Sequence, residues 1–124
     1  MGVTVRSALV PDGLWGFYDR RYRLVTIKST LGPIQYLSTL AHELGHAYYG
    51  HSGHHPKNES KADKWAARQL LTFDQVLDCA RTTLSASQIA LNLNVMPWVV
   101  EAFVNTLDAD QVVSMMNQVS EHHA

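Results

Sequence analysis

His42 and His46 lie four residues apart in the stretch HELGH of this 124-residue chain, with Glu43 directly after the first of them. On a helix, side chains at this spacing lie one turn above the other, so both imidazoles can face a single ion. Glu43 lies further round the helix, where its carboxylate can reach a water molecule bound to that ion. Two neutral nitrogen ligands beside a carboxylate base are typical of hydrolytic zinc sites, so this spacing predicts bound Zn²⁺ with Glu43 as general base.

Catalytic zinc usually has three protein ligands, and several residues compete for the third position. A further histidine at the spacing H-E-x-x-H-x-x-G-x-x-H is excluded, because Tyr49 and Ser52 stand where that pattern needs glycine and histidine. His54 and His55 lie in the short loop HSGHHPK, but nothing in their spacing directs them to the ion.

Glu59 is the best candidate for the third ligand, because it begins the next helix and Asp63 follows one turn later. Metal-bound histidines usually donate their second N–H to a carboxylate, a role open to Asp63. The segment NESKAD also resembles the Asn-Glu-x-x-x-Asp element of thermolysin-type gluzincins, which implies Glu59 as ligand and Asp63 as that partner. Alternatively, both acids complement the helix dipole and pair with Lys61 or Lys64.

The elements that must position these residues follow from the changing period of the apolar residues. Residues 3–10, 14–19 and 23–29 are predicted strands, with DRRY as a hairpin turn. From Gly32 to Tyr49 apolar residues recur every three or four positions, which predicts the helix that carries HELGH. Further helices are predicted from Asn58, from Thr72 as N-cap, and over residues 85–92, 97–107 and 109–119.

This layout predicts an α+β fold with a small N-terminal sheet, a metal-binding helix and a C-terminal helical bundle. The length fits one domain, residues 1–124, in which 1–31 form the sheet, 32–71 carry the metal site and 72–124 are helical.

The charge distribution is uneven although the net charge is only −1. All ten Lys and Arg residues lie at or before Arg81, so the last third of the chain is acidic and favours neither nucleic acid nor an anionic membrane. The single cysteine, Cys79, falls in an apolar pattern and is predicted to be a small buried residue. With no signal-peptide pattern or membrane span, the sequence predicts a cytoplasmic protein.

Two segments together resemble the ImmA/IrrE family of metallo-endopeptidases. They are LSTLAHELGHAYYGH and ESKADKWAARQLL; the second matches E-x-x-A-[ND]-x-F-A-x-x-L-L, with Trp65 in place of the phenylalanine. The resemblance covers residues 37–71. It implies an intracellular protease, often encoded on prophages or mobile elements, that cuts a partner transcriptional repressor.

A rival interpretation comes from SASQIALNLNVMPWVVEAFV, whose apolar spacing is that of a helix-turn-helix with Asn94 at the turn. Its second helix carries Glu101 and no basic residue, which disfavours DNA binding. The alternative function is therefore a non-catalytic, metal-stabilised interaction or regulatory module. In that case His51, His54, His55 or Asp63 would close the site as a fourth ligand.

The preferred hypothesis is a zinc endopeptidase in which His42, His46 and Glu59 bind the ion and Glu43 transfers the proton. A substrate peptide is expected to pair with a free edge of the sheet, with RLVTIK as the suggested strand. The sequence does not identify the group that stabilises the oxyanion. The candidates are Tyr48, Tyr49, His51, His54 and His55.

Overall fold

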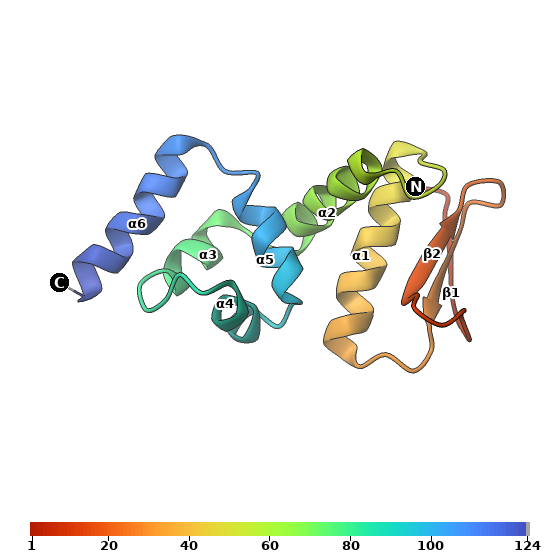
Figure 1. Cartoon of the computed structure of the whole chain (residues 1–124), viewed down its shortest axis with the longest axis horizontal. Coiled ribbons are helices and arrows are strands. Elements are labelled where there is room, and N and C mark those ends of the chain that lie inside the picture. The colour runs from red at the N-terminus through yellow and green to blue at the C-terminus, as the bar shows by residue number, and fades with distance from the viewer. Residues whose placement is uncertain (124) are drawn as a thin grey trace.

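The computed structural model describes the backbone of residues 1–123 and the side chains of residues 1–118. Three strands precede six helices in that part of the chain: β1 (Thr4–Ala8), β2 (Gly16–Asp19), β3 (Leu24–Lys28), α1 (Pro33–Tyr49), α2 (Pro56–Leu70), α3 (Phe73–Cys79), α4 (Ala86–Leu93), α5 (Pro97–Val104) and α6 (Ala109–His123). The predicted α+β class is confirmed. The sheet lies at one end of an elongated molecule and α6 at the other, with α2 between them (Figure 1).

The strand order β1-β3-β2 places β3 in the centre of the sheet. β3 pairs in parallel with β1 and antiparallel with β2, so both of its edges are occupied. The suggestion that RLVTIK presents a free edge was therefore wrong, because sequence alternation identifies a strand but not its neighbours. The free edges belong to β1 and β2.

One face of the sheet packs against α1, and a glycine permits the close approach. Val25 and Ile27 of β3 are fully buried there. A Cβ placed at Gly16 would lie 2.8 Å from the carbonyl oxygen of Thr26 and 3.1 Å from Thr39 Cγ2 of α1. The absence of a side chain at Gly16 thus lets β2 lie against the helix that carries HELGH.

α5 ends at Val104 rather than at residue 107, α6 continues to His123 rather than ending at residue 119, and the start of α2 also differs from the prediction. Helix α2 begins at Pro56, and His55 is its N-cap residue. The imidazole of His55 accepts a hydrogen bond from the backbone N–H of Lys57. The prediction chose Asn58 because asparagine is a common N-cap, but a proline at the first helical position favours the earlier start. At α3 the capping box of Thr72 and Gln75 is confirmed.

A second apolar core lies among α2 to α6. Ala67 of α2 and Leu71, the residue that follows α2, join it, together with Ile89, Val99 and Phe103. α4 and α5 pack against each other and are joined by residues 94–96, in which Asn94 ends α4 with a left-handed backbone and φ of 57°. No helix within residues 1–123 has the length and apolarity needed to cross a membrane.

Candidate metal centre

Helix α1 buries an unusually polar set of residues. Ser38, Thr39, Glu43 and His46 are all buried, whereas three of the periodic apolar residues that predicted this helix are exposed: Ile34, Leu37 and Tyr48. The helix lies between the sheet and α2, so its buried face is wider than a single apolar stripe and includes the HELGH side chains. The apolar spacing predicted the helix correctly but not which of its residues are buried, because apolar spacing alone cannot reveal a buried polar site.

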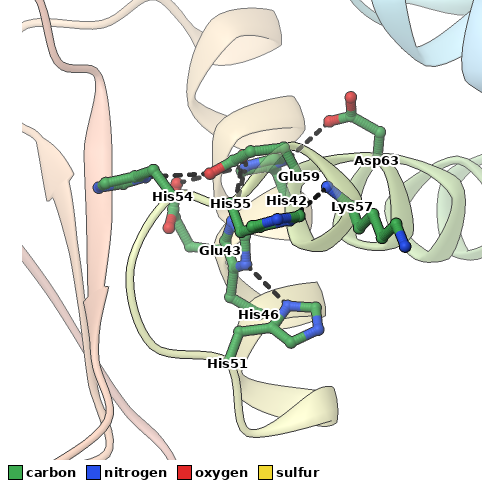
Figure 2. Close-up of polar contacts among 9 residues, drawn as sticks. All are labelled: His42, Glu43, His46, His51, His54, His55, Lys57, Glu59 and Asp63. Atoms are coloured by element: carbon green, nitrogen blue, oxygen red, sulfur yellow. Dashed lines mark hydrogen bonds and ion pairs between the residues drawn. The ribbon is translucent and has the colours of Figure 1, made fainter.

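The approach of α2 to this face depends on Gly45. A Cβ at Gly45 would lie 2.9 Å from the carbonyl oxygen of Ala62 and 3.0 Å from its Cα. The glycine thus faces the backbone of α2. The tight crossing brings Glu59 and Asp63, one turn apart on α2, to the histidines of α1 (Figure 2).

His42, His46 and Glu59 offer three ligand atoms that all lie within 4.8 Å of one another. Glu59 Oε2 lies 2.8 Å from His42 Nε2 and 3.2 Å from His46 Nε2, and the two Nε2 atoms are 3.1 Å apart. Tetrahedral ligands at about 2.0–2.1 Å from zinc would be separated by roughly 3.3 Å. The donor set and its spacing therefore fit a single ion of this kind.

Each histidine also has a partner on its other nitrogen. His42 Nδ1 lies 2.7 Å from Asp63 Oδ1, and His46 Nδ1 lies 3.0 Å from Nδ1 of His51 (Figure 2). Donation from Nδ1 fixes the ring orientation and leaves Nε2 free for a metal. Asp63 occupies the position expected for such a partner, whereas the contact with His51 was not foreseen.

Glu43 is buried beside the three-ligand group. Its Oε1 has no hydrogen-bond partner, and its Oε2 lies 3.9 Å from His42 Nε2. Burial raises the pKa of Glu43 to about 7, against the opposing positive charge of His42. A buried carboxylate oxygen without a partner is costly, which indicates that a group outside the chain, such as water or substrate, normally meets it.

The electrostatic environment differs between the two histidines. Burial and the neighbouring charge of His42 hold the pKa of His46 below its ordinary value. Burial acts to lower the pKa of His42 too, but the hydrogen bond to Asp63 and the nearby carboxylates raise it overall. For Glu59, burial is outweighed by the hydrogen bond to His54 and by both histidines, so its pKa is lowered. A metal ion would therefore compete with protons chiefly at His42.

The loop histidines take other roles. His54 Nδ1 lies 3.0 Å from Oε1 of Glu59, the oxygen that faces away from the histidine pair, while His55 caps α2. Among the other oxyanion candidates, Tyr48 stacks on Trp65 and Tyr49 on His51. Of these residues, His54 contacts the predicted ligand Glu59 and His51 contacts the predicted ligand His46.

Two tryptophans that the sequence did not single out line the surface beside the cluster. A cleft of about 230 Å³ is bounded by Trp15, which directly precedes β2, by Trp98 of α5 and by His42 and Glu43. The indole of Trp98 meets the His42 ring edge-on at 5.8 Å between centroids. No local pattern links position 98 to position 42, because α5 reaches α1 only through the packing of the C-terminal helices.

Comparison with protein families identifies the chain. The Peptidase_M78 family model, described as the IrrE N-terminal-like domain, matches residues 1–101. This span contains the sheet, α1, α2 and every residue of the candidate metal centre, and it ends within α5. A search of curated proteins gave no match, and a search of solved structures gave none. The resemblance seen in the sequence is confirmed, and the chain belongs to the ImmA/IrrE family of peptidases.

Proposed function

We propose that this peptidase is a zinc-dependent endopeptidase in which His42, His46 and Glu59 bind the ion and Glu43 is the general base. The observation that carries the proposal is the group of three ligand atoms within 4.8 Å of one another, beside a buried carboxylate oxygen that has no partner in the chain. A structural zinc site would be closed by a fourth protein ligand, and this group has three.

The residues divide the reaction between them. Bound zinc would supply Lewis acidity, which polarises the scissile carbonyl and makes a water molecule more acidic. Glu43 accepts the proton of the attacking water and returns it to the leaving amine. Asp63 and His51 hold the two imidazoles in the orientation that leaves Nε2 for the ion. His54, on the outer oxygen of Glu59, is the side chain best placed to contact a substrate carbonyl.

The free edge of β2 is the proposed place for the substrate backbone. β2 pairs with β3 on one side only, and the cleft beside Glu43 begins at Trp15 and Gly16. An extended peptide added to this edge would continue the sheet and pass over the metal ligands of α1. The walls formed by Trp15 and Trp98 favour an apolar side chain next to the cleaved bond.

The resemblance to ImmA/IrrE proteases favours an intracellular protein substrate, and we propose a transcriptional repressor of a phage or mobile element acting in the cytoplasm. Incubation of the zinc-loaded protein with a repressor encoded beside its gene, followed by mass spectrometry, would identify the cleaved bond. An intact repressor with the parent protein, under conditions where peptides are cleaved, would contradict this choice of substrate.

The activity itself is tested with Glu43→Gln. This variant retains all three proposed ligands, so its zinc content by plasma mass spectrometry should equal that of the parent. Hydrolysis of a fluorogenic peptide library should fall by roughly two orders of magnitude or more, in line with loss of general-base catalysis. Equal hydrolysis by both proteins at equal zinc content would exclude the proposed mechanism.

A further inference from the structure

An apolar groove lies between α4, α5 and α6, at the far side of α5 from the sheet. Its volume is about 530 Å³, and its walls include Leu84, Ile89, Val100, Val104, Met115 and Met116. Leu84 and Met116 are 49% and 57% exposed, so this apolar surface is open to solvent. Open apolar surface of this kind marks sites where another molecule binds. We call it the α4–α6 groove.

The α4–α6 groove adjoins a second hollow that borders the metal centre. Glu101 of α5 and Asn105, the residue that follows α5, line the groove. The same two residues line the second hollow, whose volume is about 530 Å³ and whose other walls include Glu59, Asp63 and Trp98. A chain that leaves the groove across Glu101 and Asn105 therefore arrives beside the proposed ligand Glu59. The groove itself is lined by none of the residues of the candidate metal centre.

The charges around the groove are mainly acidic. Glu101 is in its wall, Asp108 and Asp110 lie at the start of α6, and no Lys or Arg follows Arg81 in the sequence. Among the basic residues of the neighbouring elements, Lys64 of α2 lines the second hollow but not the groove, and Arg68 and Arg81 have polar partners. Arg68 donates to the carbonyl oxygen of Thr106, and Arg81 pairs with Asp78. A ligand with basic residues beside its apolar face would complement this surface.

We propose that the α4–α6 groove binds an amphipathic, Lys- or Arg-rich helix of the protein substrate and so delivers the adjoining chain to the metal centre. The proposal rests on the proposed peptidase function and names a docking site for its substrate. Three helices supply the walls, and a fourth helix laid between them would bury its apolar stripe as in other helix-in-groove complexes. The flexible side chains of Met115 and Met116 can adapt to the ligand.

Binding is tested with two fluorescein-labelled peptides of about 18 residues, long enough for five helical turns. Both have leucine at positions i, i+3, i+4 and i+7, and their polar positions are lysine in one and glutamate in the other. Anisotropy titration of the parent should show binding of the lysine peptide, weakening with salt, and at least about tenfold weaker binding of the glutamate peptide. Equal affinity for the two peptides would overturn the proposal.

Matched variants locate the binding site. Met116→Glu places a charge in the groove, whereas Leu91→Glu makes a similar change on α4 at a residue that is 70% exposed and outside the groove walls. Met116→Glu should weaken binding of the lysine peptide by about tenfold or more, while Leu91→Glu should leave it within about twofold of the parent. Glu101→Lys should weaken it as well, by reversing the charge in the wall. Equal effects of the Met116 and Leu91 variants would place binding elsewhere.

Two further measurements separate this proposal from the peptidase assignment. Glu43→Gln should bind the lysine peptide as the parent does, so loss of peptidase activity would leave the docking result unchanged. Attaching the lysine peptide to a sequence that the parent cleaves should speed its hydrolysis by the parent but not by Met116→Glu. A dimer in sedimentation experiments that Met116→Glu disrupts and Leu91→Glu does not would make a second copy the occupant, and would overturn the proposal.

Discussion

At the scale of single residues, the main distinction is between side chains that face the proposed ion and those that hold them. Glu59 Oε2 faces both histidine Nε2 atoms, whereas Asp63 contacts the other nitrogen of His42 and His54 contacts the other oxygen of Glu59. Removing a ligand and removing a partner of a ligand should therefore have different effects on metal affinity.

Glu59→Ala should lose zinc affinity more severely than Asp63→Ala, for which a loss of ~10–100-fold is expected because the ring of His42 is no longer fixed. His55→Ala should bind zinc nearly as the parent does, because His55 caps α2 and faces no ligand atom. His54→Ala should also stay near the parent. Competitive titration with a chromophoric zinc chelator measures all four variants. Zinc binding by Glu59→Ala equal to the parent's, with failure of either loop-histidine variant, would transfer the third ligand to the loop.

Cys79 offers a test of burial that is independent of the metal. Its side chain belongs to the C-terminal apolar core with 8% exposure. Burial raises the pKa of the Cys79 thiol above its ordinary value, although a hydrogen bond to Asn92 opposes the rise. Because the thiolate is the reactive form, we expect slow reaction with a disulfide reagent at pH 8 and rapid reaction in denaturant. Rapid, complete labelling of the folded protein would contradict a structural role.

At the scale of elements, the crossing of α1 and α2 decides whether the ligands meet. Gly45 lies in the middle of α1, where replacement by alanine alone would favour the helix by about 1 kcal/mol. The added Cβ would, however, meet the backbone of Ala62 at 2.9–3.0 Å, and a backbone contact cannot be relieved by a rotamer change. Overpacking of this kind costs about 1–3 kcal/mol.

Gly45→Ala should therefore lower the midpoint of thermal unfolding and weaken zinc binding, since α2 must move away from α1 with Glu59 on it. The matched control is Gly32→Ala, at the N-cap of the same helix, where the nearest atom lies 3.8 Å from the added Cβ. The control should retain the zinc affinity of the parent. Unchanged zinc affinity together with a raised unfolding midpoint in Gly45→Ala would mean that the crossing is looser than the structure indicates.

At the scale of the whole molecule, the C-terminal helices complete the site. The backbone N–H of Met96 donates to Ser38 Oγ of α1, and Trp98 lies against His42. Helix α5, the would-be recognition helix of a helix-turn-helix, thus packs toward the metal centre and buries Val99, Val100 and Phe103. Its position fits a wall of the cleft better than a DNA-reading element.

We accordingly expect no salt-sensitive binding to duplex DNA. Gel-shift or anisotropy titration with random-sequence duplex at low salt should give no complex at micromolar protein. The C-terminal third has no Lys or Arg to contact phosphates, so it cannot gain affinity by releasing the counterions of DNA. A complex whose affinity falls steeply with salt would revive the regulatory-module alternative. Glu101→Lys offers a positive comparison, since it introduces a cation on α5.

The sequence by itself determined the parts of the protein that depend on local spacing. The interval of four between His42 and His46 places both on one side of any helix, and Thr72 with Gln75 dictates the start of α3. The motif around Glu59 likewise indicated the family resemblance, which the match of the family model to residues 1–101 confirms. These features need no knowledge of distant contacts.

Only the tertiary structure decided which segments meet. Strand alternation fits either an edge or a central strand, so the place of β3 in the sheet required its two partners. The polar face of α1, the contact of His51 with His46 and the wall formed by Trp98 arise from packing between residues up to 58 positions apart. Apolar periodicity shows only that one face of a helix or strand is buried. Which other element packs on that face depends on how well the two surfaces fit together.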